Sequence, residues 1–149
     1  MKKILFFLTF ILLSFSITAQ TGEDSVKAVV NKLFAAFKNS DAASIKASFT
    51  EHAILQTIAV KEGNTIIETD KVDDVAESIG KLSKGDADER IVYDVIKING
   101  ALAIVWCPYK FYYKGVFSHC GVDSFQLVKI NGEWKIQYLI DTRTKKGCE

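Results

Sequence analysis

Hydrophobic residues recur at helical spacing through the first half of the chain. Residues 24–38 carry apolar side chains every three or four positions, which predicts a helix with one buried stripe. That stripe consists of Val26, Val29, Val30, Leu33, Phe34 and Phe37. A shorter helix is expected from Asp41, and a third over residues 70–84 with Gly85 as its stop. Between the second and third, residues 53–60 and 64–69 predict a short hairpin around Glu62-Gly63.

The second half of the pattern predicts strands. Four runs between residues 90 and 143 are separated by Asn99-Gly100, Lys114-Gly115 and Asn131-Gly132. Asn-Gly favours a type I′ hairpin turn, because both central residues of that turn need a positive φ. Three two-residue turns would fix the register of the strands, since residues directly opposite in a hairpin share a face. We therefore expect an α+β fold in which a curved antiparallel sheet wraps over about three N-terminal helices.

The predicted register assigns a face to each strand residue. It places Trp106 opposite Tyr93 and Asp123, Lys110 opposite His119, and Phe125 opposite Tyr138. These side chains, together with Ile104, Leu127 and Tyr112, would form the inner face, whereas Val105, Cys107, Phe111, Val122 and Asp141 would lie on the outer face. Pro108 cannot donate a ladder hydrogen bond, so we expect a bulge near it that would change the register beyond that point.

Residues 1–20 have the composition of a signal peptide. Lys2 and Lys3 precede an apolar run from Ile4 to Ile17 that is short for a membrane span. We expect cleavage after Ala19, with Gln20 as the alternative, and export of a single domain of residues 21–149 to the periplasm or the medium. An uncleaved anchor is the second possibility. Loss of the two lysines changes the formal net charge from +1 to −1.

Charge and motifs exclude several classes. Acidic and basic residues are interspersed without a basic stripe, so no nucleic-acid partner is expected. No phosphate-binding loop, dinucleotide fingerprint or zinc-ligand spacing is present, and we expect neither a cofactor nor a metal. The three cysteines, Cys107, Cys120 and Cys148, leave at least one thiol free, or paired between chains, if the other two bond.

The order of elements resembles the nuclear-transport-factor-2-like superfamily, and within it the SnoaL-like and "putative lumazine-binding" branches. The likeness rests on Val29-Val30-x-x-Leu33-Phe34, on Phe49-Thr50-Glu51-His52-Ala53 and on the closing Asn131-Gly132-Glu133-Trp134-Lys135-Ile136. The resemblance implies a cone with a pocket at its wide mouth and frequent dimerisation through the outer sheet face. It does not choose an activity, since members of this fold include isomerases, dehydratases, cyclases and proteins without catalysis.

Asp123 and His119 are the candidate catalytic residues. They are four residues apart on one strand, roughly 13 Å by strand rise, so they do not form a hydrogen-bonded pair. Either could act alone as a general base, with Tyr93 or Tyr138 as the donor, as relatives resembling ketosteroid isomerase use a pocket carboxylate with a tyrosine. Against this, no second carboxylate is expected deep in the inner face. The alternative for Asp123 is a structural carboxylate tied to a tyrosine hydroxyl or a backbone amide.

Three functions remain open. The first is a binding protein that holds a small hydrophobic or aromatic molecule in an apolar pocket lined by Tyr93, Trp106, Lys110, Tyr112, His119, Asp123 and Tyr138. The second is an isomerase or dehydratase that uses Asp123 or His119 as its base. The third is an interaction protein that forms a homodimer or docks on a partner through Val105, Phe111 and Val122. We favour the first, although Lys110 also fits a snorkelling surface side chain and the aromatic residues also fit a packed core.

Overall fold

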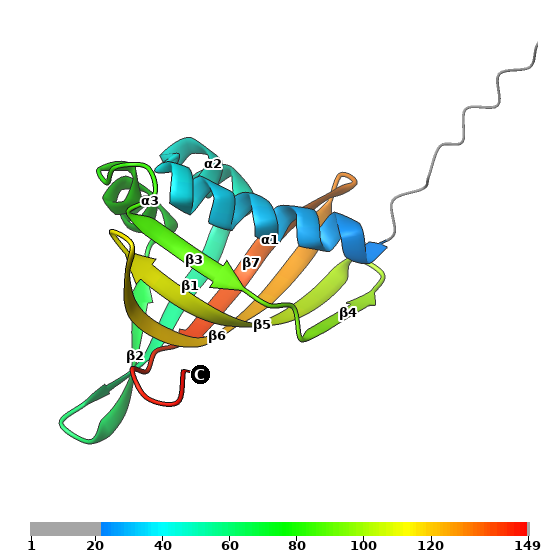
Figure 1. The fold of residues 1–149 in the computed structure, drawn as a ribbon. Helices are drawn as coiled ribbons and strands as arrows, with labels where there is room; N and C mark the ends of the chain where they lie inside the picture. Colours follow the sequence, from blue (N-terminus) through cyan, green and yellow to red (C-terminus); the bar gives the residue numbers. More distant parts are fainter. Residues whose placement is uncertain (1–21, 149) are drawn as a thin grey trace, which may run out of the picture.

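The computed structural model describes residues 22–148, and the predicted signal peptide lies outside them. The helices are α1 (Gly22–Asn39), α2 (Ala42–Ser48) and α3 (Val72–Gly80). The strands are β1 (Phe49–Lys61), β2 (Asn64–Asp70), β3 (Ala87–Ile91), β4 (Val95–Asn99), β5 (Leu102–Tyr113), β6 (Val116–Ile130) and β7 (Glu133–Thr142). The predicted α+β cone is confirmed, because one curved sheet wraps around α1 while α2 and α3 cover one end (Figure 1).

The sheet has seven strands in the order β2-β1-β7-β6-β5-β3, and β4 pairs with β5 beside β3. It is mixed rather than wholly antiparallel, because β1 runs parallel to β7. The first predicted run is divided into β3 and β4 by residues 92–94. Both short strands pair with β5, one along each half of that long strand.

The helices follow the predicted apolar pattern with one difference. The whole α1 stripe is buried or packs against the core, and Phe34 meets Phe125 of β6 edge-on at 6.1 Å between ring centroids. The Asp41 side chain caps α2 by accepting from the Ser44 amide at 3.0 Å. Helix α3 is shorter than predicted and ends at Gly80, a poor helix former. The following loop is held by the Gly85 amide, which donates to the carbonyl of Lys38 at 2.7 Å.

A bulge between β5 and β6 overturns the predicted faces of β5. Near the Lys114-Gly115 turn the pairing is as predicted, but Phe111 then pairs with His119 while Tyr112 pairs with Phe117. Ser118 is therefore an extra residue, and beyond it the register shifts by one. A bulge was predicted near Pro108 of β5, but the extra residue lies in β6 and closer to the Lys114-Gly115 turn. The shift turns Ala103, Val105, Cys107 and Tyr109 into the core and leaves Ile104 and Trp106 exposed on the outer face.

A second bulge divides the pairing of β6 with β7. Leu127 pairs with Ile136 as predicted, whereas Gln126 pairs with Tyr138, so Gln137 is the extra residue. The Gln137 side chain accepts a hydrogen bond from the Thr50 hydroxyl at 2.8 Å and donates to the His52 carbonyl at 3.1 Å. These bonds join the bulge to the irregular start of β1. Beyond the bulge Asp141 faces inward opposite Asp123, which corrects its predicted outer position.

The turns explain part of the register. Both turn residues have a positive φ in Glu62-Gly63, Lys114-Gly115 and Asn131-Gly132, as the type I′ prediction requires. The turn between β4 and β5 was predicted at Asn99-Gly100 but lies at Gly100-Ala101, because Asn99 pairs with Leu102. Each residue of β4 therefore pairs with a residue of β5 two positions away from the predicted one. Because side chains alternate along a strand, a change of two positions does not alter which residues of the two strands share a face.

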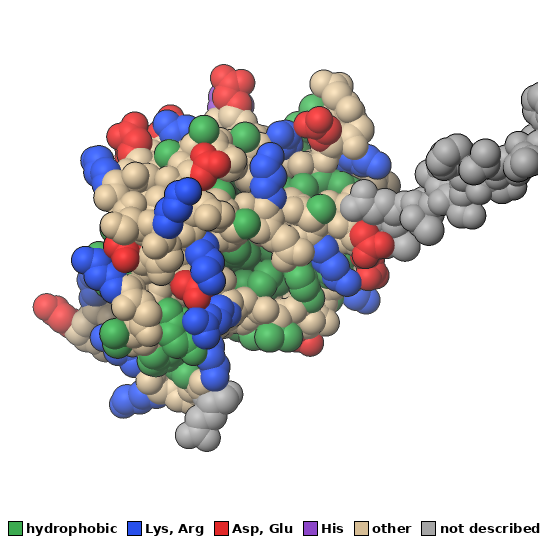
Figure 2. Space-filling view, turned by 45° about the horizontal axis from the view of Figure 1, so that its top comes forward, with side chains coloured by type: hydrophobic (Ala, Val, Ile, Leu, Met, Phe, Trp, Pro, Cys, Tyr) green, Lys and Arg blue, Asp and Glu red, His purple; other side chains and the backbone are tan. Residues whose placement is uncertain are grey.

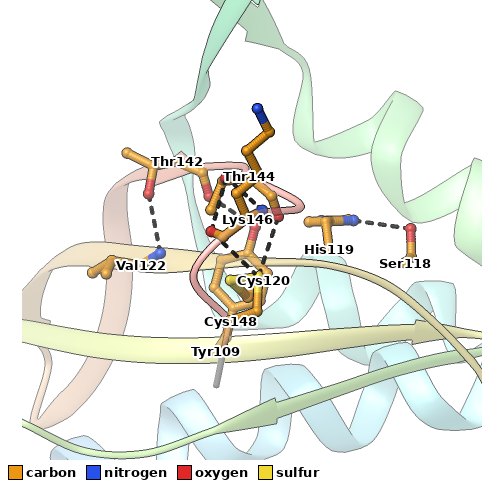
Figure 3. Close-up of a disulfide and its surroundings, with 9 residues drawn as sticks. All are labelled: Tyr109, Ser118, His119, Cys120, Val122, Thr142, Thr144, Lys146 and Cys148. Atoms are coloured by element: carbon orange, nitrogen blue, oxygen red, sulfur yellow. Dashed lines mark hydrogen bonds between the residues drawn. A yellow bond between two sulfur atoms is a disulfide. The ribbon is translucent and has the colours of Figure 1, made fainter.

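The C-terminal tail is fixed across β6 (Figure 3). A disulfide joins Cys120 to Cys148, and the backbones of Cys120 and Thr144 exchange hydrogen bonds of 2.9 and 2.8 Å. Cys107 is the free cysteine and is buried. The tail continues directly from β7, so the disulfide closes a loop of the chain that contains β7 and the part of β6 after Cys120.

Gly121 permits the close crossing of β7 over β6. A Cβ atom at this position would lie 1.7 Å from the Thr142 carbonyl oxygen, which is also the acceptor of the Tyr109 hydroxyl at 2.9 Å. The φ of Gly121 is not in the left-handed region. Glycine is required here for space and not for its backbone freedom.

Charged side chains of both signs are interspersed over the face shown in Figure 2. This agrees with the absence of a basic stripe in the sequence. Among residues 22–148, no helix is both long and apolar enough to cross a membrane.

We predict that Gly121→Ala lowers the free energy of unfolding by on the order of 3 kcal/mol, because the β6–β7 backbone must move apart to admit the methyl group. Chemical denaturation measures this. Gly63→Ala is the control, since Gly63 has a φ of +81° but open space around it. The control should lose only about 1 kcal/mol from backbone strain. Equal losses in the two variants would contradict a steric role for Gly121.

Candidate functional site

A small cavity lies between the helices and the concave side of the sheet. Its volume is about 90 Å³, which corresponds to roughly three water molecules. One wall is apolar and the other polar, and the lining consists of Leu33, Phe34, Phe37, Leu55, Gln56, Thr57, Asp70, Val75, Glu89, Tyr109, His119, Asp123, Leu139, Asp141 and Arg143. Asp70 and Arg143 are exposed, so the cavity reaches the surface beside them. The structure therefore replaces the predicted aromatic pocket with a cavity that is acidic on one side.

Asp123 is the most deeply buried charged group of this wall, with 3% of its surface exposed. Its Oδ2 atom has no hydrogen-bond donor among the described residues. The carboxyl group of Glu89, from β3, is its neighbour and interacts with it through a hydrogen bond. Two carboxyl groups can form such a bond only when one of them carries the proton. Glu89 and Asp123 therefore form an acid pair that shares a proton.

Burial sets the pKa values of this pair. Burial, and then the charge of Glu89, raises the pKa of Asp123 well above its ordinary value of 3.8. Burial also raises the pKa of Glu89 from 4.5 to about 7, although its hydrogen bond with Asp123 opposes the rise. The pair therefore holds a proton that isolated carboxyl groups would lose well below neutral pH, and Glu89 titrates near neutral pH.

Asp141 is buried in the same wall but has a full set of partners. Its carboxylate accepts from the Thr57 hydroxyl at 2.5 Å, from the Tyr109 hydroxyl at 3.2 Å and from Nε of Arg143 at 2.7 Å. The guanidinium of Arg143 also donates to the Thr57 hydroxyl at 2.9 Å. The charge of Asp141 is therefore balanced within the protein, unlike that of the acid pair.

His119 lies at the edge of the cavity. Its ring packs between Tyr109 and Phe111, and its Nδ1 atom is 3.0 Å from the Ser118 hydroxyl (Figure 3). Burial, and then the positive charge of Arg143, lowers the pKa of His119. The imidazole is therefore neutral at neutral pH. Cys107 pairs with Asp123 across β5 and β6, and burial and then the charge of Asp123 raise the pKa of its thiol to about 12.

The predicted site residues do not gather in one place. Asp123 and His119 both line the cavity, as their shared face on one strand predicted. Tyr138 lies on the opposite side of the sheet from Asp123, and its hydroxyl donates to Gln56 at 2.6 Å. Trp106 is 45% exposed on that outer face, because the Ser118 bulge shifts its pairing to Ser124. The premise that Trp106, His119, Asp123 and Tyr138 face one interior is wrong.

The remaining three predicted residues also lie away from the cavity. Lys110 is exposed and pairs with Cys120 rather than His119. Tyr112 packs on the outer side against Phe117 and carries the Arg90 guanidinium 4.1 Å from its ring centroid. The Tyr93 hydroxyl donates to Asn31 of α1 at 2.8 Å, which is a structural contact.

Glu89, Asp141 and Tyr109 are the site residues that the sequence reasoning missed. Glu89 is four residues before Tyr93, which was assigned to the inner face, so extending the alternation of that strand would have found it. Asp141 was assigned to the outer face because its position depends on the bulge at Gln137. The expectation that the inner face has no second carboxylate is wrong.

Three larger hollows lie on the surface, with volumes of about 350, 540 and 310 Å³. None of them is lined by a buried charged side chain in the described part of the protein. We therefore assign the candidate site to the smaller cavity, on its chemistry and not on its size. Within residues 22–148, no three carboxylate, imidazole or thiol groups are placed to hold a metal ion together.

Residues 21–138 match the family described as "Putative lumazine-binding". The chain belongs to this family, within the nuclear-transport-factor-2-like superfamily that the sequence resembled. None of the curated proteins matches the sequence significantly.

Solved structures of similar fold include several bacterial proteins of unknown function. A nuclear-transport-factor-2-like protein from Shewanella baltica is 15% identical with a TM-score of 0.65, and the match covers 83% of this chain and 94% of that one. A domain with a cystatin-like fold from Nostoc punctiforme is 18% identical with a TM-score of 0.63, covering 84% and 78%. A protein from Methylobacillus flagellatus is 17% identical with a TM-score of 0.63, covering 82% and 91%. At these identities the likeness shows the fold alone.

We predict that Glu89→Gln stabilises the protein relative to wild type as the pH rises. A carboxyl group whose pKa is raised on folding stabilises the protein below its unfolded value of 4.5, and this contribution is lost as the pH rises through about 7. The variant should gain about 2 kcal/mol over wild type between pH 5 and pH 8. Denaturant unfolding of wild type and variant at both pH values measures this difference. The contribution of His119 to stability has the opposite pH dependence, but it is present in both proteins and cancels in the comparison. A difference that does not change with pH would contradict the buried acid pair.

Proposed function

We propose that this chain is an exported protein that binds a small molecule in the cavity beside Asp123. The observation that carries the proposal is the buried Asp123 carboxyl, which lines a cavity open to the surface and has an oxygen without a donor. Buried polar groups are nearly always paired, and those that are not are concentrated at functional sites. The family description also supports a small-molecule ligand.

Export is supported by two features of the chain. The first is the basic start followed by an apolar run in residues 1–20. The second is the Cys120–Cys148 disulfide, since such bonds persist in oxidising compartments outside the cytoplasm.

Proton transfer is the second candidate, with Glu89 as the base. Its pKa of about 7 suits a general base at neutral pH, and the pKa of Asp123 beside it is raised well above its ordinary value, as a general acid requires. The Tyr109 hydroxyl also lines the cavity, although it donates to Asp141 and to the Thr142 carbonyl. An enzyme of this kind would convert the bound ligand, so incubation of any ligand with the protein and analysis of the products by NMR distinguishes it from a binding protein.

We predict that ligands found by a thermal-shift screen of the purified protein lose at least tenfold in affinity in Leu139→Phe. Leu139 lines the cavity, and the larger ring would occupy volume that the ligand needs. Ile104→Phe is the matched control, because Ile104 is exposed on the outer face of the sheet. Affinity measured by titration calorimetry should be unchanged in the control. A screen without ligands, or ligands that bind both variants equally, would refute binding in this cavity.

A further inference from the structure

The charges around the cavity are unbalanced. The other titratable and charged groups that line the cavity or interact with the acid pair are Asp70 of β2, Cys107 and Tyr109 of β5, His119 of β6, Asp141 of β7 and Arg143 of the tail, whereas α1, α3 and β1 contribute none. Arg143 is the one cation among the described lining residues, and its guanidinium is bound to Asp141 and Thr57. Within residues 22–148, no cation is therefore hydrogen-bonded to Glu89 or Asp123, and the charge of Arg143 opposes the rise of their pKa values only from a distance.

Asp123 has a buried oxygen that no N–H or hydroxyl of the described residues reaches. An ionised carboxylate accepts several hydrogen bonds and donates none. An anion in the cavity would be repelled, and an apolar group would leave the buried oxygen unpaired. A positively charged group with several N–H donors supplies both of the missing interactions.

The dimensions of the cavity limit this group to a few atoms. A volume of about 90 Å³ accommodates an ammonium, amidinium or guanidinium head, but not a drug-sized ligand, for which sites usually have about 300–1,000 Å³. The apolar wall formed by Leu33, Phe34 and Phe37 lies on the other side of the same cavity. A short hydrocarbon stem attached to the charged head would exceed this volume, so only its first carbons would pack against this wall and the rest would extend toward the opening beside Asp70 and Arg143.

We propose that the cavity binds the cationic head of a small alkyl amine, amidine or guanidine, which donates hydrogen bonds to Asp123 and Glu89 while its hydrocarbon stem packs against α1. This inference rests on the proposed small-molecule function and specifies its ligand class. A guanidinium or amidinium is the best match, because its parallel N–H groups can contact both carboxyl groups at once.

Binding of a cation should release the proton that the acid pair shares. The pair carries one proton near neutral pH, and the bound cation favours the fully ionised form. Affinity should therefore increase as the pH rises, by up to about tenfold per pH unit where one proton is displaced. His119 adds little to this rise, because its lowered pKa keeps it neutral over the same range.

The test uses three probes that share one stem: n-butylguanidinium, neutral n-butylurea and anionic valerate. Titrations of the purified full chain, followed by NMR chemical shifts or calorimetry, are carried out at pH 6, 7 and 8. We expect n-butylguanidinium to bind at least tenfold more tightly than n-butylurea at pH 8, and valerate not to bind. Asp123→Asn and Glu89→Gln should each reduce the affinity for the cation at least tenfold. Glu133→Gln, at the exposed β6–β7 turn, makes the same chemical change away from the cavity and should have no effect.

The outcomes separate this inference from the proposed function. If n-butylurea or valerate binds as tightly as the cation, and Leu139→Phe abolishes that binding, the cavity is a small-molecule site but its cation preference is refuted. Equal cation affinity in wild type and Asp123→Asn would also refute it, as would affinity that falls with rising pH. If no probe and no compound of the thermal-shift screen binds, the proposed function fails together with the inference.

Discussion

Two one-residue bulges determine which side chains of the sheet face helix α1. Ser118 shifts β5 against β6, and Gln137 shifts β7 against β6. Because side chains alternate along a strand, each shift exchanges one face of a strand for the other. Val105 and Tyr109 are turned into the interior by the first bulge and Asp141 by the second. The composition of the core and of the cavity follows from these two positions.

Burial of carboxyl groups is the energetic cost of this arrangement. Asp141 is compensated by Arg143, Thr57 and Tyr109, and the tail that carries Arg143 is held by the disulfide and by the Cys120–Thr144 bridge. The acid pair of Glu89 and Asp123 has no such hydrogen-bonded cation among the described residues, and it shares a proton instead. A hydrophobic pair of similar volume would stabilise the fold better, which is the pattern expected where selection has preserved a binding or catalytic site at the expense of stability.

The outer face of the sheet is a second surface, distinct from the cavity. It exposes Ile104 and Trp106, whereas Val105 and Phe111, which the sequence analysis placed there, lie on the inner side. Dimerisation through this face stays a prediction, now with different residues at its centre. The cavity and the outer face are on opposite sides of one sheet, so binding at one does not require contact at the other.

The sequence by itself determined the helices, most turns and the family. Those features depend on local spacing: the α1 stripe, the Asp41 cap and the glycines that give turns a positive φ are all read from residues a few positions apart. It also found Asp123 and His119, because two residues an even number apart on one uninterrupted strand must share a face. The bulges were decided only by the tertiary structure, since an extra residue is tolerated where contacts from distant segments compensate for it. Gln137 bonds to the start of β1, and Ser118 adjoins the tail held at Cys120. The partnership of Asp123 with Glu89 and the outward position of Trp106 and Tyr138 are consequences of that long-range packing, which no local pattern contains.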